Sequence, residues 1–305
     1  MVLSKGISEP GRTSPILTIK GISRDGVVLI TPSDPDFKLE LSSLLKGKDS
    51  RAKALIDAAM PFCVFVKNTN NEDIVGCSLQ WDIVRADGTT TTRGTSHSSP
   101  GSLTGLRAAD PAMVGRTSLV NAKSTRFFSL DPDAKLFIDA LTRSFGARPP
   151  LSPEQEQEAV NHIQYLRAMR KELIQPGDSI TVSIDGLILS DGTFSGPDKN
   201  QLILSTKALI EAQRDISEII DRQVKQNGDS DKVFEVIDSL STDPRSLRKF
   251  DAQEARFEHF YWKLLRISID ELIGIRDARG SAAAIKYSQD AYHRRWPSLH
   301  PKLNN

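Results

Sequence analysis

The sequence is poor in several features that would assign it to a class at once. Only two of its 305 residues are cysteines, which excludes a disulfide-stapled scaffold and a zinc site with four cysteine ligands. No run of about 18 apolar residues occurs, so we expect no membrane span. The 40 Lys and Arg residues are balanced by 39 Asp and Glu residues, giving a net charge of +1. No global field therefore draws the chain to nucleic acid, and we expect no nucleic-acid partner.

The composition that remains is typical of a soluble globular protein, with 38% hydrophobic, 26% charged and 6% aromatic residues. Residues 1–13 are rich in Gly, Ser and Pro without apolar periodicity, which predicts a flexible tail. Polar residues interrupt every apolar run of residues 1–21, so the chain as written has no signal peptide and is expected in the cytoplasm. A true start upstream of Met1 would leave an extracytoplasmic location open.

The two cysteines, Cys63 and Cys77, are expected on the two strands of one hairpin, at similar heights on either side of a polar turn. A cross-strand disulfide is conceivable if both side chains share a face. The alternation of apolar residues indicates that Cys63 points to the other face, so buried, unbonded thiols are the favoured interpretation.

Period-two alternation of branched apolar residues predicts a series of strands in the N-terminal part of the chain. Short alternating runs occupy residues 16–22, 26–32 and 37–44. Residues 49–60 instead show helical spacing, and Pro61 ends that helix.

The clearest strand covers residues 74–84 and follows another strand at residues 61–68. Its apolar residues are expected on one buried face, namely Val75, Cys77, Leu79, Trp81 and Ile83. Asp87-Gly88 is the pair most favoured in a two-residue hairpin turn, and the Thr-rich run 89–95 returns as an exposed edge or half-buried strand. We therefore expect three consecutive antiparallel strands.

The strand pattern continues at residues 124–130 and 178–194, on either side of a helical insertion at about 132–175. Within the insertion, Pro153 at a first helical position and a basic last turn predict a well-capped helix. From residue 200 onward all apolar spacing is helical. The sequence thus predicts a flexible tail at 1–13, a β-sandwich domain at 14–199 and an α-helical C-terminal region at 200–305.

The run FVKNTNNEDIVGCSLQWDIVRADGTTTT resembles a bacterial immunoglobulin-like β-sandwich of the FxLYD type. The resemblance is carried by Asn68-Thr69 at a strand end, by Trp81 and by the Asp87-Gly88 hairpin. It implies an α+β fold class: an immunoglobulin-like antiparallel β-sandwich with a helical insertion, followed by an α-helical C-terminal region. It implies no activity and no functional residues.

The Asp/Gly-rich loop at residues 185–198 is the most unusual segment of the chain. Its carboxylates Asp185, Asp191 and Asp198, together with nearby carbonyls, would suit calcium, which takes about six to eight oxygen ligands. The favoured interpretation is a set of tight turns in which Gly supplies positive φ and Asp forms Asx turns. No other motif implies a metal or a cofactor.

A dense aromatic patch, formed by Phe257, Phe260, Tyr261 and Trp262, covers more than one face of a predicted helix and is a candidate interface. No nucleophile elbow, phosphate-binding loop or helical pair of metal ligands occurs. The sequence therefore favours a non-catalytic protein-interaction or scaffold module that binds another protein or a second copy of itself. The alternative is a hydrolase or divalent-cation-binding protein with its site at the 185–198 loop.

Overall fold

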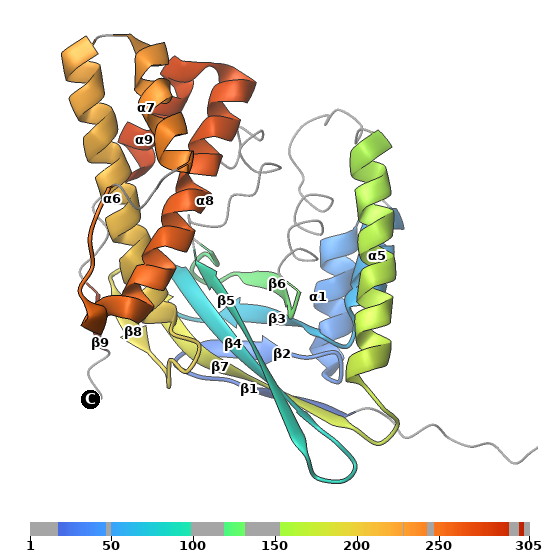
Figure 1. Ribbon diagram of the computed structural model, residues 1–305. Coiled ribbons are helices and arrows are strands. Elements are labelled where there is room, and N and C mark those ends of the chain that lie inside the picture. Colours follow the sequence, from blue (N-terminus) through green and yellow to red (C-terminus); the bar gives the residue numbers. More distant parts are fainter. Residues whose placement is uncertain are drawn as a thin grey trace, which may run out of the picture.

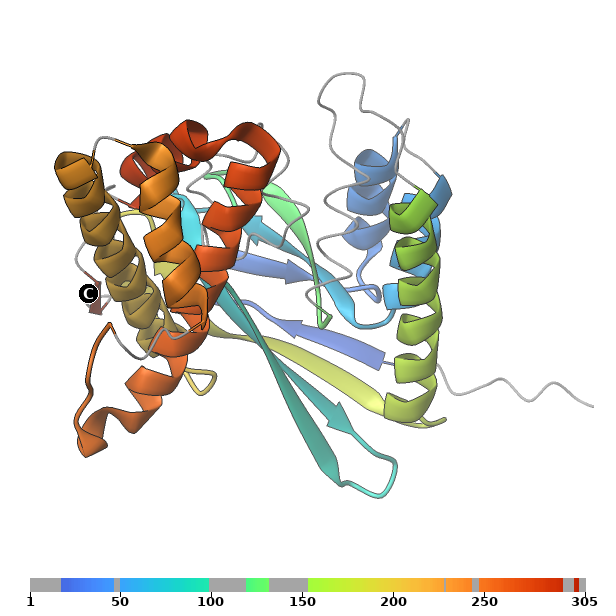
Figure 2. The same ribbon diagram turned by 45° about the horizontal axis from the view of Figure 1, so that its top comes forward.

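Two β-sheets lie face to face, with helices against the outer side of one sheet and a helical bundle at one end of the other (Figures 1 and 2). The computed structural model describes residues 18–46, 50–98, 119–131, 153–227, 229–242, 247–292 and 299–301. The α+β class is confirmed. The expected tail at residues 1–13 and the first part of the expected insertion lie outside the described residues.

Sheet A has six strands: β1 (Thr18–Ile22), β4 (Ile74–Val84), β5 (Thr90–Ser98), β7 (Ser179–Leu189), β8 (Thr193–Ser195) and β9 (His300–Pro301). Their order is β5-β4-β7-β8-β9, and β1 also pairs with β7. The β1–β7 and β8–β9 pairs are parallel. Sheet A is therefore mixed, which corrects the expectation of a purely antiparallel sandwich.

Sheet B is antiparallel and contains β2 (Val27–Ile30), β3 (Cys63–Asn68) and β6 (Thr125–Ser129) in the order β2-β3-β6. Helices α1 (Pro35–Leu45), α2 (Ser50–Ala59) and α5 (Pro153–Leu173) pack on its outer side through one apolar cluster. The predicted helix with Pro153 in its first turn and a basic last turn is confirmed by α5.

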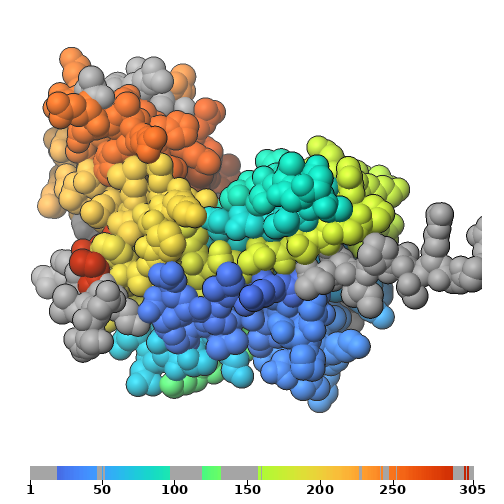
Figure 3. Space-filling model, turned by 90° about the horizontal axis from the view of Figure 1, so that it is seen from below, coloured from blue at the N-terminus to red at the C-terminus, as the bar shows by residue number. Residues whose placement is uncertain are grey.

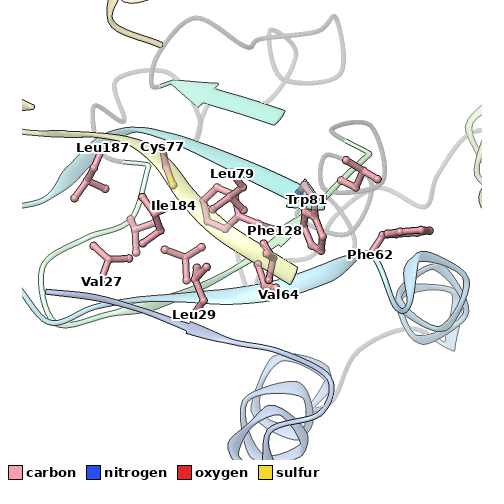
Figure 4. Close-up of a cluster of buried hydrophobic side chains, with 14 of the residues drawn as sticks. Val27, Leu29, Phe62, Val64, Cys77, Leu79, Trp81, Phe128, Ile184 and Leu187 are labelled. Atoms are coloured by element: carbon pink, nitrogen blue, oxygen red, sulfur yellow. The ribbon is translucent and has the colours of Figure 1, made fainter. Parts of the chain in front are cut away.

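The main hydrophobic core lies between the two sheets (Figure 4). The alternation predicted for β4 is confirmed at four positions that are fully buried in this core: Cys77, Leu79, Trp81 and Ile83. Val75 was expected on the same face, but it packs with Ile188 and Leu202 on the other side of the sheet. A register shift between Ile74 and Gly76 explains the difference, because an extra residue in one strand reverses the faces beyond it.

The expected hairpin of residues 61–84 does not form. Strand β3 pairs with β2 and β6, whereas β4 pairs with β5 and β7, so the chain passes from one sheet to the other between them. Cys63 and Cys77 consequently lie in different apolar clusters, buried and unbonded. Burial raises the pKa of the Cys63 thiol, and it raises that of Cys77 to about 12.

The strand predicted at residues 37–44 is the helix α1. Pro35 occupies the start of the helix after Asp34, whose carboxylate accepts hydrogen bonds from the N–H and hydroxyl of Thr31. Phe37, Leu41 and Leu44 pack together beneath sheet B, at the i, i+4, i+7 spacing of one helical face. Leu39, which alternates with Phe37 and Leu41, is 70% exposed. The helical spacing and the Asp34-Pro35 start therefore prevail over the alternation.

The C-terminal region contains α6 (Leu202–Asn227), α7 (Ser230–Thr242), a short 3-10 helix (Ala252–Glu254), α8 (Ala255–Arg279) and α9 (Ser281–Tyr292). These helices share one core and form a bundle, which α6 joins to the outer face of sheet A through Leu202. The region is not wholly helical, because β9 returns to pair with β8. No helix of the described part combines the length and the hydrophobicity needed to cross a bilayer.

Candidate functional site: the open edge of sheet A

Strands β4 and β5 form a long hairpin that projects beyond the rest of the molecule (Figure 1). Its turn is a three-residue loop, since the N–H of Arg85 donates to the carbonyl of Thr89 and the N–H of Gly88 donates to the carbonyl of Arg85. Gly88 has a φ of 85°, the left-handed conformation that this loop requires at its last position. The loop is thus one residue longer than the expected two-residue turn, and Asp87 and Gly88 are its last two residues.

The turn fixes which backbone groups of β5 face outward. Antiparallel pairs alternate between those that exchange hydrogen bonds and those that do not. Counting from Arg85 and Thr89, residues of β5 that bond to β4 are the odd-numbered ones. The outward-facing N–H and C=O groups therefore belong to Thr90, Thr92, Gly94 and Ser96. No residue that the structure describes bonds to these groups, so within the described part of the chain this edge of sheet A is open.

The opposite side of the sandwich shows how this chain closes an edge. The N–H of Ile19 in β1 donates to Ser33 Oγ at 3.2 Å, and its carbonyl accepts from Thr31 Oγ1 at 3.3 Å. The N–H of Leu29 in β2 donates to Ser23 Oγ at 3.1 Å. Side-chain hydroxyls thus form hydrogen bonds with backbone groups that could otherwise pair with a further strand.

Strand β5 carries few of the usual protections of an exposed edge. It has nine residues and no proline or lysine, and its pairing with β4 has no bulge. Arg93 is its one arginine. At about 3.4 Å per residue the edge is about 30 Å long. A long and weakly charged edge with an uninterrupted register is a ready template for another strand.

Side-chain hydrogen bonds hold this edge in position on the solvent side of the sheet (Figure 3, teal). Thr92 Oγ1 donates to the Asp82 carboxylate at 2.6 Å, and Gln80 Nε2 donates to the same carboxylate at 2.9 Å. Ser96 Oγ donates to Ser78 Oγ at 3.2 Å. Because β5 is fixed to β4 in this way, a docking chain would meet an ordered edge and would not have to order it.

The 185–198 loop joins sheet A to the helical bundle. Asp185 is 2% exposed, and its carboxylate accepts from the N–H groups of Lys199 at 2.9 Å and Asn200 at 2.8 Å. Ser78 Oγ donates to the same carboxylate at 3.3 Å. Its oxygens are thus used by donors from this chain, where a cation ligand would keep them available.

The other two candidate metal ligands also make turn contacts. Asp198 accepts from the N–H of Ile203 in the first turn of α6, and Asp191 accepts from the N–H of Thr193. The structure brings Asp185 and Asp198 together, since the N–H of Asp198 donates to the carbonyl of Asp185. Asp191 bonds to neither of them in the described part of the chain. In the described part of the chain, no three side chains of the metal-binding types form a group that could hold an ion.

The pKa of the Asp198 carboxyl lies above its ordinary value. Desolvation, and secondarily repulsion from Asp185, raise the pKa of Asp198, although the N–H groups of Ile203 and Leu202 act in the opposite direction. The folded state therefore binds a proton on Asp198 more tightly than the unfolded state does. The stability that this proton contributes is present below the ordinary aspartate pKa and is lost as the pH rises through the raised pKa of the folded state.

We expect Asp198→Asn to raise the free energy of unfolding at pH 7, because the amide can still accept from Ile203 and carries no charge beside Asp185. The gain should disappear below about pH 4, where Asp198 is itself neutral. Denaturant unfolding at pH 7 and pH 3.5 measures both. The control Asp198→Ala should cost about 1 kcal/mol through the lost helix-start contact, and a destabilised Asp198→Asn variant at pH 7 would contradict the assignment.

The aromatic patch proposed as an interface lies partly in the bundle interior. Tyr261 is fully buried, and its hydroxyl donates to Asp215 Oδ2 at 2.6 Å. Burial, followed by this hydrogen bond, raises the pKa of Tyr261. Phe257, Phe260 and Trp262 are half-buried around the same core. Tyr261 therefore offers no surface to a partner.

Phe250 and Arg248 cover the aromatic patch from the segment between α7 and α8. The Phe250 ring lies 5.1 Å from that of Tyr261 and 5.4 Å from that of Trp262. Arg248 stacks on the Phe250 and Tyr261 rings, and its guanidinium also lies 3.7 Å from the Asp215 carboxylate. Much of the aromatic surface thus serves to hold this segment on α6 and α8.

Comparison with known proteins gives no guide to the site: no family model, no curated protein and no solved structure matches this chain. Sequence reasoning named an edge position as one option for the Thr-rich strand but did not name it as a site. The signal was present, since a nine-residue strand without proline or lysine that follows an Asp-Gly turn is a long unprotected strand.

Proposed function

We propose that this protein is a non-catalytic protein-interaction module that binds an extended segment of a partner as an added strand on β5. The observation that carries the proposal is the open edge, where Thr90, Thr92, Gly94 and Ser96 present backbone donors and acceptors without partners among the described residues. Strand addition to an exposed edge is an established mode of peptide recognition, in which main-chain bonds supply affinity.

The arrangement accounts for binding without a preformed pocket. Each outward residue of β5 can exchange two hydrogen bonds with an antiparallel partner, and each such bond contributes about 0.5–1.5 kcal/mol net. The side-chain bonds from Thr92 and Ser96 to β4 already order the edge, which lowers the entropic cost on this side of the interface.

We further propose that the two sheets are an immunoglobulin-like sandwich with an altered edge. The support is the shared core between facing sheets, the buried Trp81 on β4 and the passage of the chain from β3 to β4 across the sheets. The parallel pairing of β1 with β7 is the departure from that pattern.

The substitution Thr92→Pro tests the proposed function. Proline removes one outward N–H and leaves every backbone bond between β4 and β5 intact, so the fold should persist while strand addition fails. The matched control Thr92→Ala also loses the bond to Asp82 but keeps the N–H. We expect the same partner to crosslink to the wild-type protein and to Thr92→Ala in equal yield. Its recovery with Thr92→Pro should fall about tenfold or more.

Circular dichroism and thermal unfolding of the three proteins establish that the fold is retained. Equal recovery of the same partner with Thr92→Pro and Thr92→Ala would exclude β5 as the binding edge. If the species recovered is a second copy of the chain, loss of the dimer in Thr92→Pro supports self-association through the same edge.

A further inference from the structure

We infer that the partner segment carries an acidic residue directly opposite Arg93. This inference rests on the proposed strand addition and adds the chemistry of the partner to it. Arg93 is exposed and lies in the middle of β5, and no described residue forms an ion pair with it. It is the one charged residue in the nine-residue sequence TTTRGTSHS.

The geometry of an added antiparallel strand gives Arg93 a particular place. Hydrogen-bonded pairs would form at the even-numbered residues of β5, so Arg93 falls at a non-hydrogen-bonded pair. Cα atoms at such pairs are about 4.5 Å apart and their side chains are closest. A carboxylate on the opposite residue would therefore meet the guanidinium on the same face of the sheet.

Nothing described on that face supplies the negative charge already. Trp81 lies opposite Arg93 on β4, and Thr95 is the next β5 residue on the same face. Trp81 Nε1 and Thr95 Oγ1 are both buried without a hydrogen-bond partner. Arg93 is thus the exposed cation of this row, and no described carboxylate pairs with it.

The charge of Arg93 also favours a different protein over a second copy of this chain as the partner. Strand β5 contains no Asp or Glu, so pairing two copies of β5 would place Arg93 opposite Thr, Gly, Ser, His or another Arg93. The acidic Asp82 beside it is engaged by Thr92 and Gln80 on the other face of the sheet. Charge complementarity therefore points to an extended, β-prone segment of another chain with one central Asp or Glu.

Selection from a random nonapeptide display library on the full-length protein tests this inference. We expect binders enriched in β-branched residues with Asp or Glu at one central position, and the same selection on Arg93→Glu to enrich Lys or Arg there. Replacing the acidic residue of a selected peptide by Gln should weaken binding about 1.5- to 5-fold, the range for an opposite-charge cross-strand pair. Arg93 is exposed, so Arg93→Glu should leave the thermal midpoint unchanged.

The variant Thr92→Pro separates this inference from the proposed function. Binders that are lost with Thr92→Pro could still show no acidic preference, or could keep the same preference with Arg93→Glu. Either result would overturn the acidic partner and leave strand addition standing. Binders that are unaffected by Thr92→Pro, or the absence of any binder, would overturn both.

Discussion

Replacing Asp185 with alanine is expected to lower the free energy of unfolding by about 3–5 kcal/mol, because hydrogen bonds to a charged acceptor contribute about 1.5–3 kcal/mol each. Two backbone N–H groups, of Lys199 and Asn200, would lose their acceptor at the junction between sheet A and α6. Ser78 would lose its acceptor as well. Denaturant unfolding measures the loss, and limited proteolysis should show new cleavage near residues 196–201.

The neighbouring carboxylate Asp191 provides the matched control. It is exposed and accepts a single turn bond from Thr193, so Asp191→Ala should cost less than about 1 kcal/mol. Similar effects of the two substitutions would mean that Asp185 does not anchor the bundle. If the Asp185 carboxylate is committed to backbone donors, calcium should not raise the melting temperature of the wild-type protein. A calcium-dependent rise in that temperature would contradict this role.

The substitution Tyr261→Ala is expected to destabilise the helical bundle by about 3–5 kcal/mol, the range for truncating a large buried aromatic residue. The side chain is fully buried against Phe250 and Trp262, and its hydroxyl bonds to Asp215. Tyr261→Phe should cost about 1.5–3 kcal/mol, since it removes only the bond to a charged acceptor. Thermal and denaturant unfolding of both variants give these values.

Partner binding at β5 should be unchanged in Tyr261→Phe, because Tyr261 lies in the bundle core whereas β5 is an edge of sheet A. A variant that keeps its stability but loses a partner would instead make Tyr261 a surface contact. That outcome would contradict its complete burial.

Local patterns predicted most of the elements and few of their pairings. Alternation along residues 74–84 predicted β4 because one face of this strand is entirely apolar. The same rule failed at residues 37–44, where Phe37, Leu39 and Leu41 alternate but Leu39 is exposed. The buried residues Phe37, Leu41 and Leu44 follow the helical period behind the Asp34-Pro35 start. Where a segment contains both periods, its end signals help to decide between them.

The sheet order could not be predicted because pairing is non-local. Strand β1 pairs in parallel with β7, more than 150 residues away in the sequence, as in Thr18 with Ser179. Turn chemistry indicates a hairpin only where the chain reverses at once, as it does at Asp87-Gly88. After β3 the chain instead enters the other sheet, and no local signal at Asn68 distinguishes the two courses.

The site was predicted less well than the fold. The loop at 185–198 contains the tight turns that were favoured, since Gly192 and Gly196 have positive φ and Asp191 accepts from the N–H of Thr193. The bonds from Lys199 to Asp185 and from Ile203 to Asp198 were not predicted. The aromatic patch was recognised as dense. Its cover was not predicted, because Phe250 lies on a separate segment that precedes α8 and packs back onto Phe257. An edge position was one option for the Thr-rich strand, but the strand pairing was needed to show that β5 lies at the edge of sheet A.

The most direct test of strand addition is residue-resolved amide hydrogen exchange of β5 by NMR, with and without a peptide from the display selection. In the protein alone, the amides of Thr91, Arg93 and Thr95 should exchange slowly and those of Thr90, Thr92, Gly94 and Ser96 rapidly. Bound peptide should slow the second group specifically. Even-numbered amides that are already protected in the protein alone, or that stay fast when peptide is bound, would contradict the account.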